Sequence, residues 1–291
     1  MASWRLPCPR PGKTMLKIFF IVFSQICIGG VALLPLVPSK EIGEGFFKFM
    51  GALYLVLMGS ALAAGVASTD HITSFGDFYS SWDGWELALA VVFTAFLAAY
   101  NLSVWFRLSA LKGGLLGASV VLGGAGIVSS SMVYVTPNVP FGIALLPLNF
   151  IASTLLLGSA TTGMLLGHWY LVSPSLSVAP LRRITLVLLV SLLAAGSLLA
   201  LNLGLAGSRT LSDSGPTLLQ ALIGIAGYGM FFWLRALVGL LFPLVIAAMV
   251  LQTLKIKATQ AATGLLYLAM VAAFAGEMLG RYLLLATSVP L

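Results

Sequence analysis

Charge, histidine and cysteine are all scarce in this sequence. Of its 291 residues only 8% are charged, whereas an ordinary soluble domain has about a quarter. So few charged side chains cannot cover a surface that faces water, which excludes a soluble globular protein. The two cysteines exclude a disulfide framework and a four-thiolate cluster. The net charge of +7 is scattered and forms no basic block, so nucleic acid is excluded as a partner.

Long apolar runs are what the sequence has instead, and its mean hydropathy is +1.07. Each run is about 20 residues or longer, the length that a helix needs to cross the hydrocarbon core. The runs must be helical because a membrane segment satisfies its backbone hydrogen bonds internally. The sequence therefore predicts an all-α polytopic membrane protein, a single domain over 1–291 with a short basic tail at 1–14. About eight transmembrane helices are expected, at 16–37, 46–67, 85–106, 114–135, 143–172, 184–205, 230–254 and 258–285.

Basic residues between the runs indicate the orientation. One side of the predicted bundle holds most of the loop cations: Lys40, Lys48, Arg107, Lys112, Arg182, Arg183, Lys255 and Lys257. The positive-inside rule places this side in the cytoplasm and both termini outside it. The basic N-terminal tail, up to Lys17, favours the reverse, so the prediction depends on the larger set of loops.

Three ionisable residues lie well inside apolar runs, where charge is costly and usually serves a function. Arg235 lies near the start of the seventh run, and Glu277 and Arg281 lie in the eighth. The i, i+4 spacing of Glu277 and Arg281 places them on one helix face, where they can pair. Arg235 needs a partner from another helix, and Glu277 is a candidate. The alternatives for these charges are a binding site for a polar headgroup and a pair that only holds helices together.

Both histidines, His71 and His168, are expected near membrane interfaces but on opposite sides, so no haem held between them is expected. His71 lies in a segment rich in carboxylates and aromatics, which is suitable for taking a proton from a quinol. An ordinary solvated loop with interfacial aromatic residues is the alternative. His168 fits an interfacial aromatic girdle, and no spacing typical of a metal site is present.

Several segments in chain order resemble the membrane-anchor subunits of dimethyl sulfoxide reductase, within the polysulfide-reductase-like anchors. They are IFFIVFSQICIGG at 18–30, SSWDGWE at 80–86, SSMVY at 130–134 with LPLNF at 146–150, and GEMLGRYL at 276–283. The resemblance covers most of the chain, and GEMLGRYL is its best match. The sequence departs from the family after His71, and at 163–174 and 257–267, which is typical of a divergent branch.

This resemblance implies a quinone-interacting anchor in a bacterial inner (cytoplasmic) membrane. Such a subunit exchanges electrons between menaquinone, or a related quinone, and a peripheral iron–sulfur or cytochrome partner, and it carries no haem. His71 would be the proton acceptor for the quinol, and His71, Arg235, Glu277 and Arg281 would form the quinone pocket. The chain would be at most one subunit of a quinone oxidoreductase complex, in contact with membrane lipids.

Two other functions remain open from the sequence. The chain could be a non-catalytic accessory subunit of a larger energy-converting complex, including a photosynthetic one. It could also be a secondary transporter, although we find no convincing repeat between its halves and transporters commonly have one.

Overall fold

The structure is a computed structural model that describes residues 11–69, 81–135, 141–173, 176–207, 217–224 and 227–291. Every element in these ranges is helical. The long helices are α1 (Pro11–Leu33), α3 (Glu44–Ser68), α5 (Trp82–Trp105), α6 (Ser109–Met132), α7 (Gly142–Val172), α8 (Ala179–Ala206), α11 (Phe242–Lys255) and α12 (Thr259–Thr287). The short ones are η1 (Leu34–Leu36), α2 (Ser39–Ile42), α9 (Leu218–Ile223), α10 (Tyr228–Trp233) and the π-helical η2 (Leu234–Leu241).

Within these ranges, eight helical spans are long and apolar enough to cross a membrane. One of them is the continuous rod of α10, η2 and α11, from Tyr228 to Lys255. The prediction of an all-α bundle with eight transmembrane helices is therefore confirmed, and the chain is a multi-pass membrane protein.

Helix ends differ from the prediction where a charge or proline lies in the first turn. Helix α1 already includes Pro11, the first described residue, and so extends into the tail predicted for 1–14. Proline is well tolerated in the first turn of a helix. Helix α6 begins at Ser109 rather than 114 and ends at Met132 rather than 135. Lys112 is thus helical, since a lysine can lie along an apolar helix and extend its ammonium to the interface.

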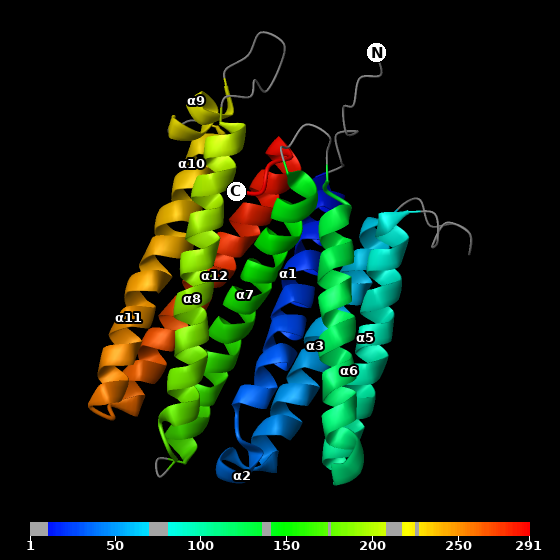
Figure 1. Cartoon of the computed structure of the whole chain (residues 1–291), viewed down its shortest axis with the longest axis vertical. Helices are drawn as coiled ribbons and strands as arrows, with labels where there is room; N and C mark the ends of the chain where they lie inside the picture. The colour runs from blue at the N-terminus through cyan, green and yellow to red at the C-terminus, as the bar shows by residue number, and fades with distance from the viewer. Residues whose placement is uncertain (1–10, 70–80, 136–140, 174–175, 208–216, 225–226) are drawn as a thin grey trace.

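The bundle consists of two groups of four helices that meet through α1 and α7 (Figure 1). On one side α3 and α6 pack on α1, and α5 packs on α3 and α6. On the other side α8 and α12 pack on α7, and α11 packs on α8 and α12. In the most apolar window of α1 78% of the residues are buried, and in that of α7 61%, against 33–44% in the other six spans. Helices α1 and α7 are therefore the centre of the molecule, and the others present much of their surface to lipid.

Close backbone contact between glycines fixes the α1–α7 crossing. A Cβ built on Gly29 would lie 2.0 Å from the carbonyl oxygen of Thr154, and one on Gly158 would lie 2.6 Å from Gly29 Cα. Small residues permit such contact between membrane helices. These glycines therefore let α1 and α7 pack tightly.

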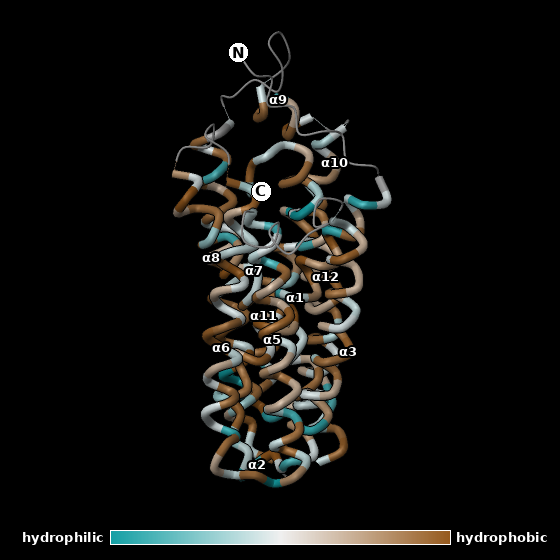
Figure 2. The backbone as a smooth tube through the Cα atoms, turned by 90° about the vertical axis from the view of Figure 1, so that its right-hand side faces the viewer, coloured by the Kyte–Doolittle hydropathy of each residue, from teal (hydrophilic) through white to brown (hydrophobic). Residues whose placement is uncertain are grey.

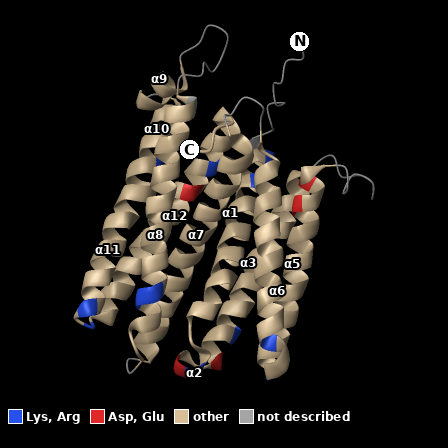
Figure 3. Cartoon of the chain, viewed as in Figure 1, with Lys and Arg blue, Asp and Glu red and all other residues tan. Residues whose placement is uncertain are grey.

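Polar residues gather toward the two ends of the bundle, and apolar residues dominate between them (Figure 2). Most charged residues follow the same pattern (Figure 3). One end carries the C-terminus and the starts of α1 and α5, and is called the terminus end below. The other carries α2 and the α5–α6 and α11–α12 turns, and is called the basic end.

Candidate functional site

A buried ion cluster, called the lysine cluster below, joins the starts of α1 and α5 at the terminus end. Lys17 Nζ lies 2.8 Å from Asp83 Oδ1 and 2.7 Å from Glu86 Oε2. The Glu86 side chain is only 3% exposed, whereas that of Asp83 is 43% exposed. One lysine thus serves two carboxylates, one of them within the protein and one near its surface.

Local sequence signals set this arrangement. Ser81 caps α5, and its side chain accepts a hydrogen bond from the Gly84 amide, as is common at helix starts. Asp83 follows in the first turn, where the helix dipole favours a negative charge. Glu86 lies one turn further, on the face that meets α1 and α6.

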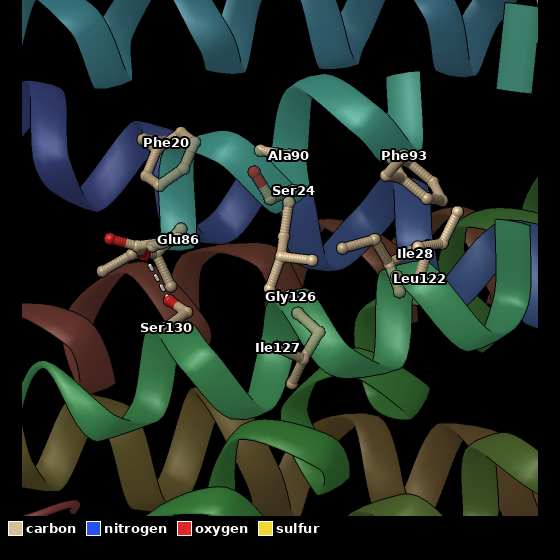
Figure 4. A pocket seen from close by; sticks show the side chains of 13 residues that line it. Phe20, Ser24, Ile28, Glu86, Ala90, Phe93, Leu122, Gly126, Ile127 and Ser130 are labelled. Atoms are coloured by element: carbon tan, nitrogen blue, oxygen red, sulfur yellow. Dashed lines mark hydrogen bonds between the residues drawn. The ribbon is translucent and has the colours of Figure 1, made fainter. Parts of the chain in front are cut away.

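A small cavity adjoins the lysine cluster between α1, α5 and α6 (Figure 4). Its volume of about 20 Å³ is enough for about one water molecule. The Ser130 hydroxyl donates a hydrogen bond to Glu86 Oε1 across this space, and Phe20 and Phe93 form apolar walls. The Ser24 hydroxyl also lines the cavity, and it has no hydrogen-bond partner among the described residues.

A second ion cluster, called the arginine cluster below, joins η2 and α12 near the same end. Arg235 donates to Glu277 Oε1 at 2.7 Å, and an Arg281 nitrogen lies 3.6 Å from Glu277 Oε2. All three side chains are no more than 6% exposed. The structure therefore brings together the three in-membrane charges that the sequence singled out. Here two guanidinium groups share one carboxylate.

Neutral groups complete the arginine cluster. Arg281 donates to Gln25 Oε1 at 3.2 Å, and Gln25 in turn donates to the Phe150 carbonyl at 3.3 Å. The Arg281 guanidinium carbon also lies 4.1 Å from the centre of the Phe150 ring, a cation–π contact. Arg235 donates to the Leu291 carbonyl oxygen at 3.4 Å. The arginine cluster is thus enclosed by α1, α7 and the segment that follows α12.

The backbone around Arg235 is adapted to this contact. Residues Leu234–Leu241 form a π-helix, a form often found at functional sites. A Cβ built on Gly276 would lie 2.3 Å from Gly239 Cα, so η2 and α12 touch at their backbones. This contact brings the first turn of η2 within reach of Glu277. The sequence gives no clear signal for the π-helix.

Tyr134, which follows α6, lies between the two clusters. Its ring stacks on Phe150 with the centroids 6.0 Å apart. Its hydroxyl interacts electrostatically with Lys17 and Glu86 on one side and Arg281 on the other. That hydroxyl is buried, and it has no hydrogen-bond partner in the part of the chain that the structure describes.

The structure describes only one of the two histidines, His168. His71 and its neighbours Asp70 and Asp77 lie outside the described residues, so their predicted roles stay predictions. The segment that contains them joins the end of α3 to Ser81 at the start of α5, close in the chain to the lysine cluster. His168 lies at the basic end, where its Nδ1 is 3.1 Å from the Tyr267 hydroxyl on α12.

Sequence reasoning missed the lysine cluster. The sequence groups Lys17 with the basic tail and gives Glu86 no role of its own, although both lie within two residues of the start of an apolar run. A charge at the start of an apolar run is a signal that could have identified each residue. Nothing in the sequence, however, indicates that Lys17 pairs with Glu86, which lies 69 residues further along the chain. Among the described residues, no three His, Cys, Asp or Glu side chains are grouped as a metal site would require.

A scan of protein-family models finds no model that matches this chain, and a search of curated proteins finds no match. The functional argument therefore depends on the residues and their geometry.

Proposed function

We propose that this chain is the quinone-interacting membrane anchor of a respiratory electron-transfer complex. It would exchange electrons between the quinone pool and a peripheral iron–sulfur or cytochrome partner, in a bacterial cytoplasmic membrane with both termini outside the cytoplasm. The observation that carries the proposal is the lysine cluster beside a cavity. It places a buried carboxylate, two hydroxyl groups and aromatic walls together at one end of a bundle otherwise built for lipid.

Quinol oxidation releases two protons and two electrons, so its site needs a proton acceptor with a route to water. Glu86 is buried beside the cavity, and Lys17 connects it to the more exposed Asp83. Charged side chains linked in this way can hold a proton near the reacting oxygen and pass it outward. In this proposal the electrons pass to the iron–sulfur or cytochrome partner.

The residues around the cavity include the hydrogen-bond donor and the aromatic side chains that a quinone headgroup requires. The Ser24 hydroxyl, which has no partner among the described residues, can donate to a ring oxygen, and Phe20 and Phe93 can contact the ring faces. The Ser130 hydroxyl already donates its one hydrogen to Glu86 Oε1. In size the cavity admits only about one water, so a headgroup would have to displace lining side chains such as Leu122. In the arginine cluster most polar groups have partners within the protein, although Glu277 Oε2 and Arg281 Nε form no hydrogen bond among the described residues. The cluster is therefore a weaker candidate for direct contact with the ring.

The test is to isolate the complex from its native membrane and measure bound quinone and co-purifying iron–sulfur protein. In this proposal both are present, and His71→Ala lowers quinol oxidation while the complex stays assembled. His168→Ala, at the opposite end of the bundle, is the matched control and should oxidise quinol at the normal rate. Full turnover and normal quinone affinity in His71→Ala would remove His71 from the site.

The closed pairing of the arginine cluster favours a second candidate, an accessory subunit that only supplies packing surface. A complex that contains neither quinone nor an iron–sulfur partner would support this scaffold function and contradict the anchor proposal.

A further inference from the structure

A larger cavity lies at the basic end, away from both ion clusters. Its volume is about 340 Å³, against about 20 Å³ for the cavity beside Glu86. It lies between α3, α5, α6 and the segment that joins α1 to α3. Most of its wall is apolar, and Glu44 and Lys112 supply its charged groups. The apolar residues that line it are Leu34, Val37, Phe47, Val104 and Leu116.

Positive charge exceeds negative charge on this side of the cavity. Lys112 Nζ lies 2.7 Å from Glu44 Oε1, and Arg107 Nε lies 3.7 Å from Glu44 Oε2. Lys48 also interacts with the same carboxylate, one turn along α3. One carboxylate cannot neutralise three cations. The neighbouring helix α2 adds one charge of each sign, Lys40 and Glu41, and does not change this excess.

The backbone holds one of these cations in a position that normally favours glycine. Arg107 has φ +57° in the turn between α5 and α6, a left-handed conformation that disfavours most side chains. The Leu108 amide donates to the Ser103 carbonyl across this turn at 2.9 Å, which fixes it. Lys257 occupies the equivalent left-handed position between α11 and α12. Neither Arg107 nor Lys257 lines the cavity itself, but Arg107 lies 3.7 Å from Glu44, which does.

An apolar cavity with excess positive charge at the membrane interface suits an amphiphilic ligand that has an anionic group and an apolar chain. We infer that it binds an anionic phospholipid, with the phosphodiester near Lys112 and Arg107 and part of an acyl chain against Phe47, Val104 and Leu116. Basic residues near a membrane surface attract such lipids. This inference depends only on the basic end and is independent of the quinone proposal.

Native mass spectrometry of the full chain, released from mixed phosphatidylglycerol and phosphatidylcholine vesicles, measures the retained lipid. Lys112→Gln should lower phosphatidylglycerol retention about fivefold, the factor expected for one basic residue near the surface. Glu44→Gln should raise it, because the cations then lack their carboxylate. Lys257→Gln is the matched control and should change nothing. If Lys112→Gln and Glu44→Gln change retention in the same direction, the pair is only structural and the inference is wrong.

A second pair of variants tests the cavity without touching charge. Gly113 lines the cavity, while its neighbour Gly114 does not, and a Cβ on either meets nothing within 4 Å. Gly113→Leu should therefore fold and lower phosphatidylglycerol retention, whereas Gly114→Leu should leave it unchanged. Equal retention in both variants would show that the lipid does not enter the cavity. Displacement of the lipid by inorganic phosphate alone would show a free-anion site and would also overturn the inference.

Discussion

The two ion clusters at the terminus end differ in both balance and enclosure. In the lysine cluster one cation faces two carboxylates, and it adjoins a cavity and a partly exposed Asp83. In the arginine cluster two cations face one carboxylate, and neutral partners from α1 and α7 close around them. Buried charge can therefore serve two purposes in one bundle: exchange with water where a path remains, and helix attachment where none does.

Substitutions in the arginine cluster should have the larger effect on the stability of the protein. Glu277→Gln leaves two buried guanidinium groups without a counter-charge, and breaking such a buried pair costs about 3–5 kcal/mol. We expect a large drop in the thermal unfolding temperature of the detergent-solubilised protein. Glu41→Gln, an exposed glutamate at the opposite end, is the control and should unfold normally. Equal unfolding temperatures for the two variants would contradict a stabilising role of the arginine cluster.

Substitutions in the lysine cluster should affect quinol oxidation more than the stability of the protein. Glu86→Gln removes the buried carboxylate that is proposed, beside His71, to accept a proton from the quinol, and loss of a general base costs about 10²-fold or more in rate. Lys17 keeps Asp83 as a partner, so unfolding should change less than in Glu277→Gln. The measurement is quinol oxidation by the assembled complex. Asp83→Asn removes the same charge and the same Lys17 contact but does not line the cavity, so its rate should fall less. Equal loss in both variants would show that charge alone matters.

The contact between η2 and α12 offers a way to disturb the arginine cluster without changing its charges. In Gly276→Ala the new methyl group would overlap the Gly239 backbone. Adding a methyl group to a packed core lowers the free energy of unfolding by about 1–3 kcal/mol. The helices must separate, which lengthens the Arg235–Glu277 contact. Gly264→Ala, on the same helix with nothing within 4 Å of its Cβ, should be neutral or slightly stabilising. Thermal unfolding compares the two, and equal behaviour would show that the close approach is not required.

The clusters also show how far the sequence could predict this molecule. Hydropathy reports which segments leave water, so the spans and the presence of Arg235, Glu277 and Arg281 inside them were predictable. The i, i+4 rule identified Glu277 and Arg281 as neighbours, and the need for a counter-charge suggested Arg235 with Glu277. Hydropathy does not report which way a helix is rotated or which helices touch. The pairing of Lys17 with Glu86, and the π-helix that brings η2 against α12, depend on those tertiary contacts.

The smallest expected effect tests what the cavity beside Glu86 is for. Ser24→Ala removes a buried hydroxyl that has no partner among the described residues, so stability should stay the same or rise. If that hydroxyl donates to a quinone oxygen, its loss costs about 0.5–1.5 kcal/mol of binding, a decrease in quinone affinity of about two- to tenfold. Ser60→Ala, an exposed serine on α3 that bonds only the Val56 carbonyl, is the control. Unchanged affinity in Ser24→Ala would move the headgroup away from this cavity and toward the segment that carries His71, because Ser24 is the one cavity hydroxyl that the described residues leave without a partner.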